Sequence, residues 1–464
     1  MMSAPQREPS TGIVTIHEEP VIFHCNHYNR FLQLTVEDCH YIQRNPILAC
    51  SAADVSRHQL QKAFADHPEW TVAERLQYAE SIYRYCGFGD MALGVVDPNG
   101  GPELQVRERH SHYGSALRLN YGKRRWAGEF FDLGFAVGSM EAATGFPYAG
   151  NIADHDPTPI SLGGDETQIL LRANEHPQGT PQQSRSITPV PTPTWIAETY
   201  SDGAEYPTGP ALESAPERSI GLHIDEDAII AAVGTLPLTG NEEGLIPAFG
   251  VYLTRHYADY YNLVSFRFEK ALAEAMETHR YLGEMLWYEY PSLFFYKDRF
   301  AHLQGRELAS TLLIEAGHIC GFNTMGGIMR SDPWYQLIVP QFQAKEDWLS
   351  GIVACINALG WGIWRIVEIV PNERLVLRAW HPYESLGHLR HFGPADHPID
   401  YLLVGVASSL MNLLYTADIT EKPELTLDFY YKVNRSKEGF WGRQTRCVAM
   451  GDPYSEVVVE RNIL

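Results

Sequence analysis

Apolar side chains recur at helical spacing in four stretches of this chain. Two lie early, at residues 53–64 and 72–85, and two lie later, at residues 271–281 and 307–329. Side chains three and four positions apart share one face of a helix, so each stretch predicts a helix with a buried face. The pattern therefore predicts that helices come first in both halves of the chain.

A hairpin is predicted after the helices in each half. Strands at residues 91–96 and 104–109 flank the turn Asp-Pro-Asn-Gly-Gly, and strands at 363–369 and 374–380 flank Pro-Asn-Glu. Pro, Asn and Gly favour tight turns because they preset or tolerate the backbone angles that turns require. Both halves are therefore expected to contain antiparallel strands.

A helix and a last group of strands close each half. The helices are expected at residues 126–143 and 398–415, where small residues would allow close packing on the sheet: Gly134, Ala136 and Gly138, then Gly405, Ala407 and Ser408. Strands are expected at 167–172, 425–434, 443–450 and 455–461. The order predicts an α+β fold of two similar units, each an antiparallel sheet covered by helices.

Short motifs recur between the halves, which indicates a duplicated fold. The repeated pairs are Gly87-Phe88-Gly89 with Gly360-Trp361-Gly362, Leu104–Arg107 with Leu375–Arg378, and His27-Tyr28 with His256-Tyr257. The expected organisation is a disordered tail at 1–12, a first domain at 13–172, a linker rich in Pro, Ser and Thr at 173–218, and a second domain at 219–464.

The balance of charge limits the partners. The 464 residues include 36 Lys and Arg against 57 Asp and Glu, a formal net charge of −21. Nucleic acid and anionic membrane surfaces both require clustered positive charge, so neither is expected as a partner. Residues 399–415, the longest apolar stretch, are too short and too polar to cross a bilayer, and residues 1–12 lack the apolar core of a signal peptide.

Cysteine usage predicts the redox state. The seven cysteines are widely scattered and form no Cys-x-x-Cys motif. That pattern favours reduced thiols and a cytoplasmic location. Phosphate loops and dinucleotide-binding motifs are absent, so no nucleotide cofactor is indicated.

Two segments of the second half resemble the 4-vinyl reductase domain family. They are Leu403-Val404-Gly405-Val406-Ala407-Ser408-Ser409 and Cys447-Val448-Ala449-Met450-Gly451-Asp452-Pro453-Tyr454-Ser455. The resemblance covers residues 307–461, and over residues 23–172 it rests on the internal repeat. The family includes sensor domains of aromatic-catabolism activators and hydrocarbon-binding proteins. The resemblance implies an apolar small-molecule pocket under the helices.

The chain departs from that family at its metal site. The resemblance implies a zinc held by cysteines and a glutamate near the C-terminal hairpin. Here Cys447 matches one cysteine, Glu438 matches the glutamate, Ser455 replaces the second cysteine, and Tyr401 or a neighbour replaces the third. One thiol and one carboxylate do not make a four-ligand zinc site.

His24-Cys25-Asn26-His27-Tyr28-Asn29 is the densest cluster of candidate chemistry, and three interpretations compete. An imidazole beside the thiol could make Cys25 a nucleophile, with His24 or His27 as base. If the segment is helical, His24 and His27 share a face and could instead form half of a metal site. The third interpretation is packing, since Cys is often buried.

His110-Ser111-His112-Tyr113 is a second cluster, expected at the end of a strand. There His110 and His112 would point the same way, which suits metal binding or proton transfer, although a polar strand end in solvent is equally simple. The candidate metal ligands are therefore His24, His27, His110 and His112, for iron or zinc. The candidate substrate-binding residues are Tyr28, Asn29, Tyr113, Trp334 and Trp361.

The combined prediction is a tandem protein of the 4-vinyl reductase type that binds or acts on a small apolar or aromatic molecule. One hypothesis is an enzyme of specialised metabolism with a Cys/His site in the first domain, performing acyl transfer through Cys25 or metal-dependent chemistry. The alternative is a non-catalytic binding or sensory module that works with a separate partner. A homodimer is expected.

Overall fold

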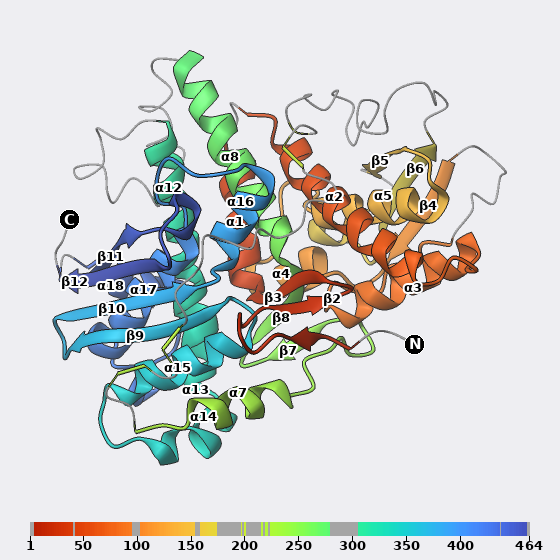
Figure 1. Cartoon of the computed structure of the whole chain (residues 1–464). Helices are drawn as coiled ribbons and strands as arrows, with labels where there is room; N and C mark the ends of the chain where they lie inside the picture. The colour runs from red at the N-terminus through yellow and green to blue at the C-terminus, as the bar shows by residue number, and fades with distance from the viewer. Residues whose placement is uncertain are drawn as a thin grey trace.

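The computed structural model describes residues 4–39, 42–94, 103–153, 158–173, 196, 199–200, 215–216, 219–220, 223–278, 305–436 and 438–461. Three antiparallel sheets and the helices that cover them make a mixed α+β fold, which confirms the predicted class. Figure 1 shows one sheet at each end of the molecule and a third between them, with long helices alongside. No helix in the described ranges is long and apolar enough to span a bilayer.

The middle sheet joins the two halves of the chain. Its strands follow the order β1-β2-β3-β8-β7, with bounds Gln6–Arg7, Val14–Ile16, Glu19–Cys25, Val251–Tyr257 and Ile246–Ala248. β3 and β8 pair antiparallel, in a register that places Val21 opposite Tyr257 and Cys25 opposite Leu253. Because β1 belongs to this sheet, the prediction of a disordered tail is wrong from Gln6 onward.

The first half contains four longer helices and a three-stranded sheet, on which α5 packs. The helices are α1 (Asn26–Glu37), α2 (Arg44–Ala65), α3 (Val72–Tyr85) and α5 (Phe130–Thr144), with the short helices η1 (His112–Ala116), α4 (Leu117–Tyr121) and η2 (Ile160–Leu162). The strands run in the order β4 (Glu103–Glu108), β6 (Thr167–Ala173), β5 (Tyr148–Ile152). Of the first predicted hairpin strand, Ala92 forms a single bridge with Arg107, and residues 95–96 lie outside the described ranges.

The second half contains a four-stranded sheet of order β11-β12-β10-β9. These strands are Phe440–Arg446, Ser455–Arg461, Arg374–Trp380 and Ile363–Val370. The longer helices are α7 (Glu226–Gly234), α8 (Ala258–Thr278), α12 (Arg306–Cys320), α15 (Asp347–Ala358), α16 (Tyr383–His391), α17 (Tyr401–Met411) and α18 (Leu427–Asn434). Shorter ones are η3 (Gly321–Met325), α13 (Gly326–Arg330), α14 (Asp332–Leu337), η4 (Val339–Gln341), η5 (Asn412–Thr416), η6 (Ile419–Glu421) and η7 (Val448–Met450).

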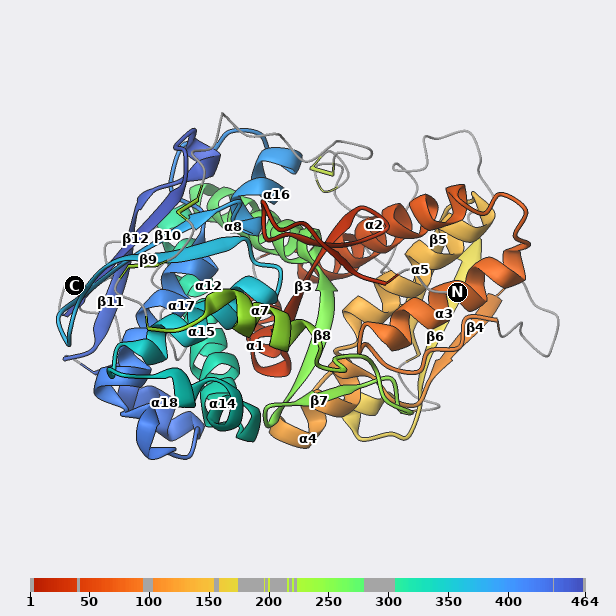
Figure 2. The same ribbon diagram turned by 60° about the horizontal axis from the view of Figure 1, so that its bottom comes forward.

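The predicted strand at 425–434 is wrong, because these residues form α18. Thr426 caps the helix by accepting a hydrogen bond from the backbone N–H of Phe429 at 3.2 Å. An N-cap hydroxyl satisfies a backbone donor that has no partner within the helix. The last strand pair is therefore β11 and β12 alone, seen as the outer ribbons in Figure 2.

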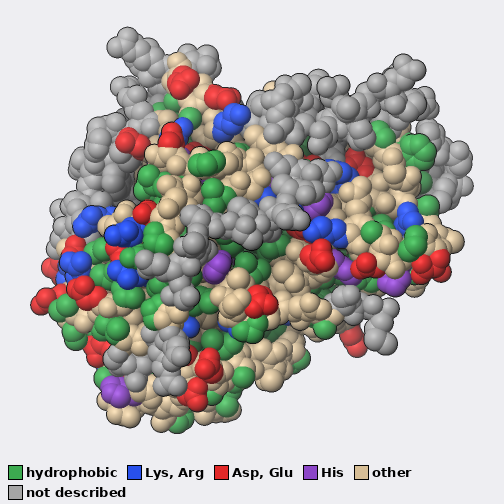
Figure 3. Space-filling view, in the orientation of Figure 1, with side chains coloured by type: hydrophobic (Ala, Val, Ile, Leu, Met, Phe, Trp, Pro, Cys, Tyr) green, Lys and Arg blue, Asp and Glu red, His purple; other side chains and the backbone are tan. Residues whose placement is uncertain are grey.

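The exposed face of this sheet carries cross-strand ion pairs. Arg374 lies 2.9 Å from Glu460, and Arg378 lies 2.7 Å from Glu456. Figure 3 shows blue and red side chains next to one another at the left of the molecule, where Figure 1 places β9 to β12. Opposite charges across neighbouring strands stabilise the pairing modestly and keep this face polar.

The described part of the predicted linker lies against the second unit. Arg267 of α8 is fully buried and donates to the Ile196 carbonyl at 2.7 Å and to the Thr199 hydroxyl at 3.0 Å. It also donates to Asp54 of α2 at 3.0 Å. A buried guanidinium needs such partners, so Arg267 links Ile196 and Thr199 to helices from both halves.

Gly134 and Gly405 bring helices together, which corrects the expected role of these two glycines, whereas Ser408 of α17 contacts Gly442 of β11 as expected. A Cβ atom at Gly134 of α5 would stand 2.2 Å from the Ala49 carbonyl oxygen of α2. One at Gly405 of α17 would stand 2.3 Å from the Ile314 carbonyl oxygen of α12. Each half therefore contains one helix pair in backbone contact.

Gly134→Ala and Gly405→Ala should each lower the free energy of unfolding by about 1 to 3 kcal/mol, because the added methyl groups meet backbone atoms that cannot move aside. Gly234→Ala is the matched control, since a Cβ atom there has no atom within 4 Å. Urea unfolding followed by circular dichroism measures the three variants. Equal stability of all three would contradict the close helix contacts.

Candidate functional site

Four of the predicted site residues meet where β3 passes into α1. His24 and Cys25 end the strand, and Tyr28 and Asn29 lie in the first turn of the helix. The segment is therefore not a continuous helix, and His24 does not share a helical face with His27. His24 and Cys25 are fully buried, and Tyr28 and Asn29 are 3% and 2% exposed.

Aromatic rings enclose the His24 imidazole. Its centroid lies 4.2 Å from the Tyr28 ring and 4.9 Å from the Trp361 ring, both stacked, and 4.6 Å from the Tyr261 ring at an edge. Burial lowers the pKa of His24 well below its ordinary value. The ring is therefore neutral at physiological pH and supplies no positive charge that would stabilise a thiolate.

Cys25 lies in the same enclosure with a second thiol. Burial raises the pKa of Cys25, against weaker effects of hydrogen bonds from Thr324 and from nearby backbone groups. Cys320 Sγ lies 3.5 Å from His24 Nδ1, and burial raises the pKa of Cys320 as well. This geometry favours the packing interpretation of Cys25 over a nucleophile, because the protonated thiol is the stable form.

Asn29 organises a buried polar network between the two halves. Its amide nitrogen donates to Thr254 Oγ1 at 3.1 Å and to His112 Nε2 at 2.9 Å. Its amide oxygen accepts from the Tyr261 hydroxyl at 2.6 Å. Both polar ends of a buried amide are thus satisfied by side chains from other elements, as burial requires.

His112 and His256 both contact the Tyr113 ring. Tyr113 OH is 3.1 Å from His256 Nε2, and the two imidazoles each have a buried Nδ1 without a hydrogen-bond partner among the described residues. Burial lowers the pKa of His112 to about 3 and that of His256 well below its ordinary value. Both rings are held neutral.

The other two predicted histidines lie elsewhere. His27 contacts the Tyr121 hydroxyl through Nδ1, and burial together with Arg30 lowers its pKa to about 4. His110 is partly exposed, with Nδ1 2.9 Å from Asp90 Oδ2. His112 starts the short helix η1 and is fully buried, so the expectation that His110 and His112 point the same way from a strand end is wrong.

The four histidines therefore do not form a metal site. Within the described ranges, no group of three or more His, Cys, Asp and Glu side chains is arranged to hold a metal ion.

The buried region between the two halves also includes residues that the sequence did not predict as site residues, notably Thr254, Tyr261, Cys320 and Tyr383. Their role depends on pairing between segments far apart in the chain, which no local motif reveals.

A carboxylate organises the position where the family resemblance places a metal. Asp400, just before α17, accepts hydrogen bonds from Ser385 Oγ at 2.7 Å, Ser455 Oγ at 2.5 Å and Gln444 Nε2 at 2.6 Å. Cys447 Sγ lies 3.6 Å from it. Glu438 is exposed and does not join this group. Hydrogen bonds thus hold together the elements that meet at Asp400.

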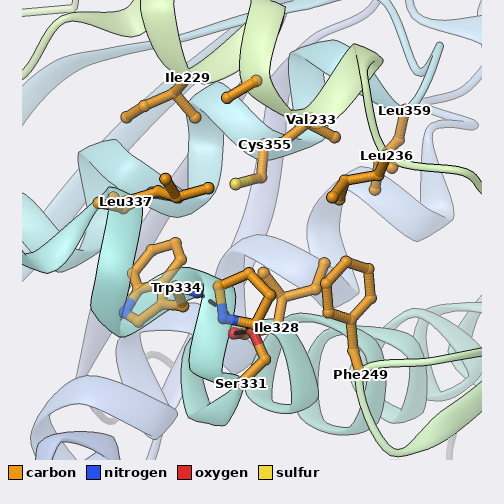
Figure 4. A pocket seen from close by; sticks show the side chains of 13 residues that line it. Ile229, Val233, Leu236, Phe249, Ile328, Ser331, Trp334, Leu337, Cys355 and Leu359 are labelled. Atoms are coloured by element: carbon orange, nitrogen blue, oxygen red, sulfur yellow. Dashed lines mark hydrogen bonds between the residues drawn. The ribbon is translucent and has the colours of Figure 1, made fainter.

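Trp334, a predicted substrate-binding residue, lines an apolar pocket under α7. Figure 4 shows side chains from α7, α13, α14 and α15 converging on it. The lining is Ile229, Ala232, Val233, Leu236, Phe249, Ile328, Ser331, Pro333, Trp334, Leu337, Ile338, Cys355 and Leu359. The free space is about 30 Å³. A cavity of this size holds about one water molecule and no aromatic ring, so a larger ligand must displace part of the lining.

Comparison with known proteins adds little to this geometry. No family profile matches the chain, and no curated protein matches it. Among solved structures, the crystal structure of the phenol-responsive sensory domain of the transcription activator PoxR with phenol is similar over 36% of this chain and 69% of that chain. The identity is 16% and the TM-score is 0.24, which does not establish a shared fold.

Native protein should not react with thiol reagents at Cys25. All seven cysteines are buried, and burial raises the pKa of Cys25. We expect alkylation by iodoacetamide at pH 8 to leave Cys25 unmodified in the folded protein and to modify it fully in urea, as read by peptide mass spectrometry. Rapid modification of Cys25 in folded protein would contradict the packing interpretation.

The neutral histidines predict how stability depends on pH. His112 has a pKa of about 3 in the fold and about 6.5 in an unfolded chain, so the unfolded state binds more protons between these values. Stability due to His112 is therefore complete above about pH 6.5 and falls by about 1.4 kcal/mol for each pH unit below it.

His112→Gln should flatten the decline of unfolding free energy between pH 6.5 and 5, because this variant cannot take up the proton. The replacement His67→Gln is the control, since the His67 side chain is 43% exposed. Urea unfolding at each pH provides the slopes. An unchanged slope in His112→Gln would show that the imidazole is already protonated or accessible in the fold.

Proposed function

We propose that this chain is a non-catalytic small-molecule-binding protein of the 4-vinyl reductase domain type, and that it binds an apolar or aromatic compound under α7. The observation that carries this proposal is the pocket, whose lining is apolar except for Ser331 and the thiol of Cys355. Ligand pockets are typically lined by apolar and aromatic side chains with a few polar groups.

Helix α7 is the element that such a ligand would displace. It contributes Ile229, Ala232 and Val233 to the pocket, while Ala231 and Gly234 on the same helix are exposed. On the opposite wall Leu337 is 52% exposed, so apolar surface continues to the rim. Outward movement of α7 would enlarge the apolar cavity without breaking a sheet.

The proposal includes descent of the two units, residues 13–172 and 219–464, from one duplicated ancestor. The order of strands supports it, since β4-β6-β5 corresponds to β10-β12-β11. Two strands of the middle sheet, β3 and β8, have a histidine as the second-last residue, His24 and His256. Each strand leads directly into a helix. By this element-based alignment His24 corresponds to His256 and Tyr28 to Tyr260, in place of the pairing of His27 with His256 expected from the motifs.

Two buried carboxylates give the proposed duplication further support. Glu129 immediately precedes α5, as Asp400 immediately precedes α17. Glu129 accepts from the Ser161 hydroxyl at 2.7 Å and from the Thr167 hydroxyl at 3.2 Å, at the start of β6. Asp400 likewise accepts from Ser455 at the start of β12. In this proposal, hydrogen-bonded carboxylates in both units take the place of the metal site that the resemblance implies.

The catalytic alternative has less support. Cys25 with His24 or His27 as base requires a thiol that ionises and a path for substrate. His24 and Cys25 are fully buried, and burial lowers the pKa of the imidazole and raises that of the thiol. Both shifts oppose the ion pair that activates a catalytic cysteine.

Binding of p-cresol tests the proposal. This probe has one aromatic ring and one hydroxyl group. At ten times its dissociation constant it should stabilise the fold by about 1.4 kcal/mol and raise the melting temperature, as read by differential scanning fluorimetry. Ala232→Phe should abolish the rise because the new ring fills the pocket.

Ala231→Phe is the matched control for this experiment. It adds the same ring to the exposed face of α7 and should leave the response to p-cresol unchanged. A response that survives Ala232→Phe would place the ligand elsewhere. Absence of any saturable response in the unaltered protein would contradict apolar ligand binding.

A further inference from the structure

A second pocket, with different chemistry, lies between α1 and α4. Its volume is about 340 Å³, within the range of ligand sites. The walls come from the last turns of α1, from α4 and from the loop 122–126 that follows α4. The lining is Arg30, Leu34, Asp38, Leu117, Tyr121, Gly122, Lys123, Arg124, Arg125 and Trp126.

Positive charge gathers in this pocket although the chain has a net charge of −21. Four of the ten lining residues are Lys or Arg, and Asp38 is the single acidic one. Arg124 forms an ion pair with Glu37, which lies outside the pocket lining. The side chains of Arg30, Lys123 and Arg125 form no hydrogen bond or ion pair with any residue that the structure describes.

Arg30 is the most constrained of these cations. Its guanidinium carbon lies 3.9 Å from the centroid of the Tyr121 ring, a cation–π contact that fixes its position. The Tyr121 hydroxyl is in turn held by His27 Nδ1. Burial lowers the pKa of Arg30, aided by neighbouring Arg124. Partial removal of a guanidinium from water without a hydrogen-bonding partner is unfavourable, and an anion would offset it.

The loop that carries the other cations is anchored on both sides. The Arg124 backbone N–H donates to the Ser161 carbonyl at 2.8 Å. Arg118 of α4 donates to the Ile160 carbonyl at 3.1 Å and to the Gly164 carbonyl at 2.8 Å. The backbone that carries Lys123 and Arg125 is thus fixed before any ligand arrives, and such preorganisation lowers the entropic penalty of binding.

We infer that this pocket binds a small molecule bearing phosphoryl or carboxylate groups, with Arg30 donating to the anion from the inner wall and Lys123 and Arg125 closing over it from the loop. Arg side chains bind both kinds of oxygen in bidentate geometry. The size of the pocket favours a small ligand over a polymer, and the acidic character of the whole chain opposes nucleic acid. The site is separate from the apolar pocket under α7.

Isothermal titration calorimetry on the full chain tests this site with pyrophosphate and with citrate as probes. We expect saturable binding of at least one of them at low ionic strength, weakened by added KCl. Tighter binding of pyrophosphate would assign a phosphoryl ligand, and tighter binding of citrate a carboxylate ligand.

The double variant Lys123→Gln/Arg125→Gln should weaken this binding by roughly tenfold or more, as expected from the loss of two charge-assisted hydrogen bonds. Both side chains are exposed, so the fold should be unaffected. Arg30→Gln should weaken binding further, with circular dichroism as the check on folding. Arg443→Gln removes an exposed charge from β11 and should leave binding unchanged.

Two results would overturn the inference. One is the absence of saturable heat with both probes. The other is equal affinity in the Lys123→Gln/Arg125→Gln protein and in the Arg443→Gln control, which would show that the anion binds elsewhere. Loss of binding in the double variant would leave the response to p-cresol intact, because the two pockets share no lining residue.

Discussion

The antiparallel pairing of β3 with β8 is the interaction on which the rest of this structure depends. It joins Glu19–Cys25 to Val251–Tyr257 and thereby links segments that are far apart in the chain. The polar side chains that follow these strands find their partners across the junction, as Asn29 does with Thr254 and Tyr261. Arg390 adds a buried ionic link, 2.9 Å from Glu19 of β3 and 2.7 Å from Asp259 of α8. Separation of the halves would break these hydrogen bonds and ion pairs and expose the apolar surface buried at the junction, which is unfavourable.

At this junction, burial opposes ionisation of the densest cluster of reactive residue types. His24, Cys25, His112 and His256 lie at the centre of the molecule, where burial keeps the imidazoles neutral and the thiol protonated. The two proposed ligand sites lie away from the junction. One candidate is the apolar pocket under α7 and the other is the basic pocket between α1 and α4. Their opposite chemistry favours two different ligands over one shared ligand.

Local features of the fold were predictable from the sequence because local rules determine them. The hairpin of β9 and β10 follows from alternating residues around Pro-Asn-Glu, and the helices follow from apolar spacing. The strand predicted at 425–434 was wrong because the apolar and aromatic residues of this segment are also typical of a strand. Thr426 instead caps a helix there. The role of Gly134 was also predicted wrongly. A small residue in a helix indicates that another element packs closely against it, but the sequence does not show whether that element is a strand or, as here, the helix α2.

The candidate site was less predictable, because it depends on contacts between distant segments. Proximity of His24 and Cys25 in sequence suggested reactivity, but the rings of Tyr261 and Trp361 that enclose His24 come from the other half. The basic pocket shows the same limitation. The run Lys123-Arg124-Arg125 is visible in the sequence, whereas its approach to Arg30 appears only when α1 and α4 pack together.

Hydrogen exchange of the two junction strands, followed by mass spectrometry, tests the central claim most directly. If β3 and β8 hold the halves together, peptides covering Glu19–Cys25 and Val251–Tyr257 should exchange at the same slow rate, with the same dependence on denaturant, because both open only in global unfolding. Fast exchange of one strand while the other stays protected would show that the halves are joined by something other than this pairing.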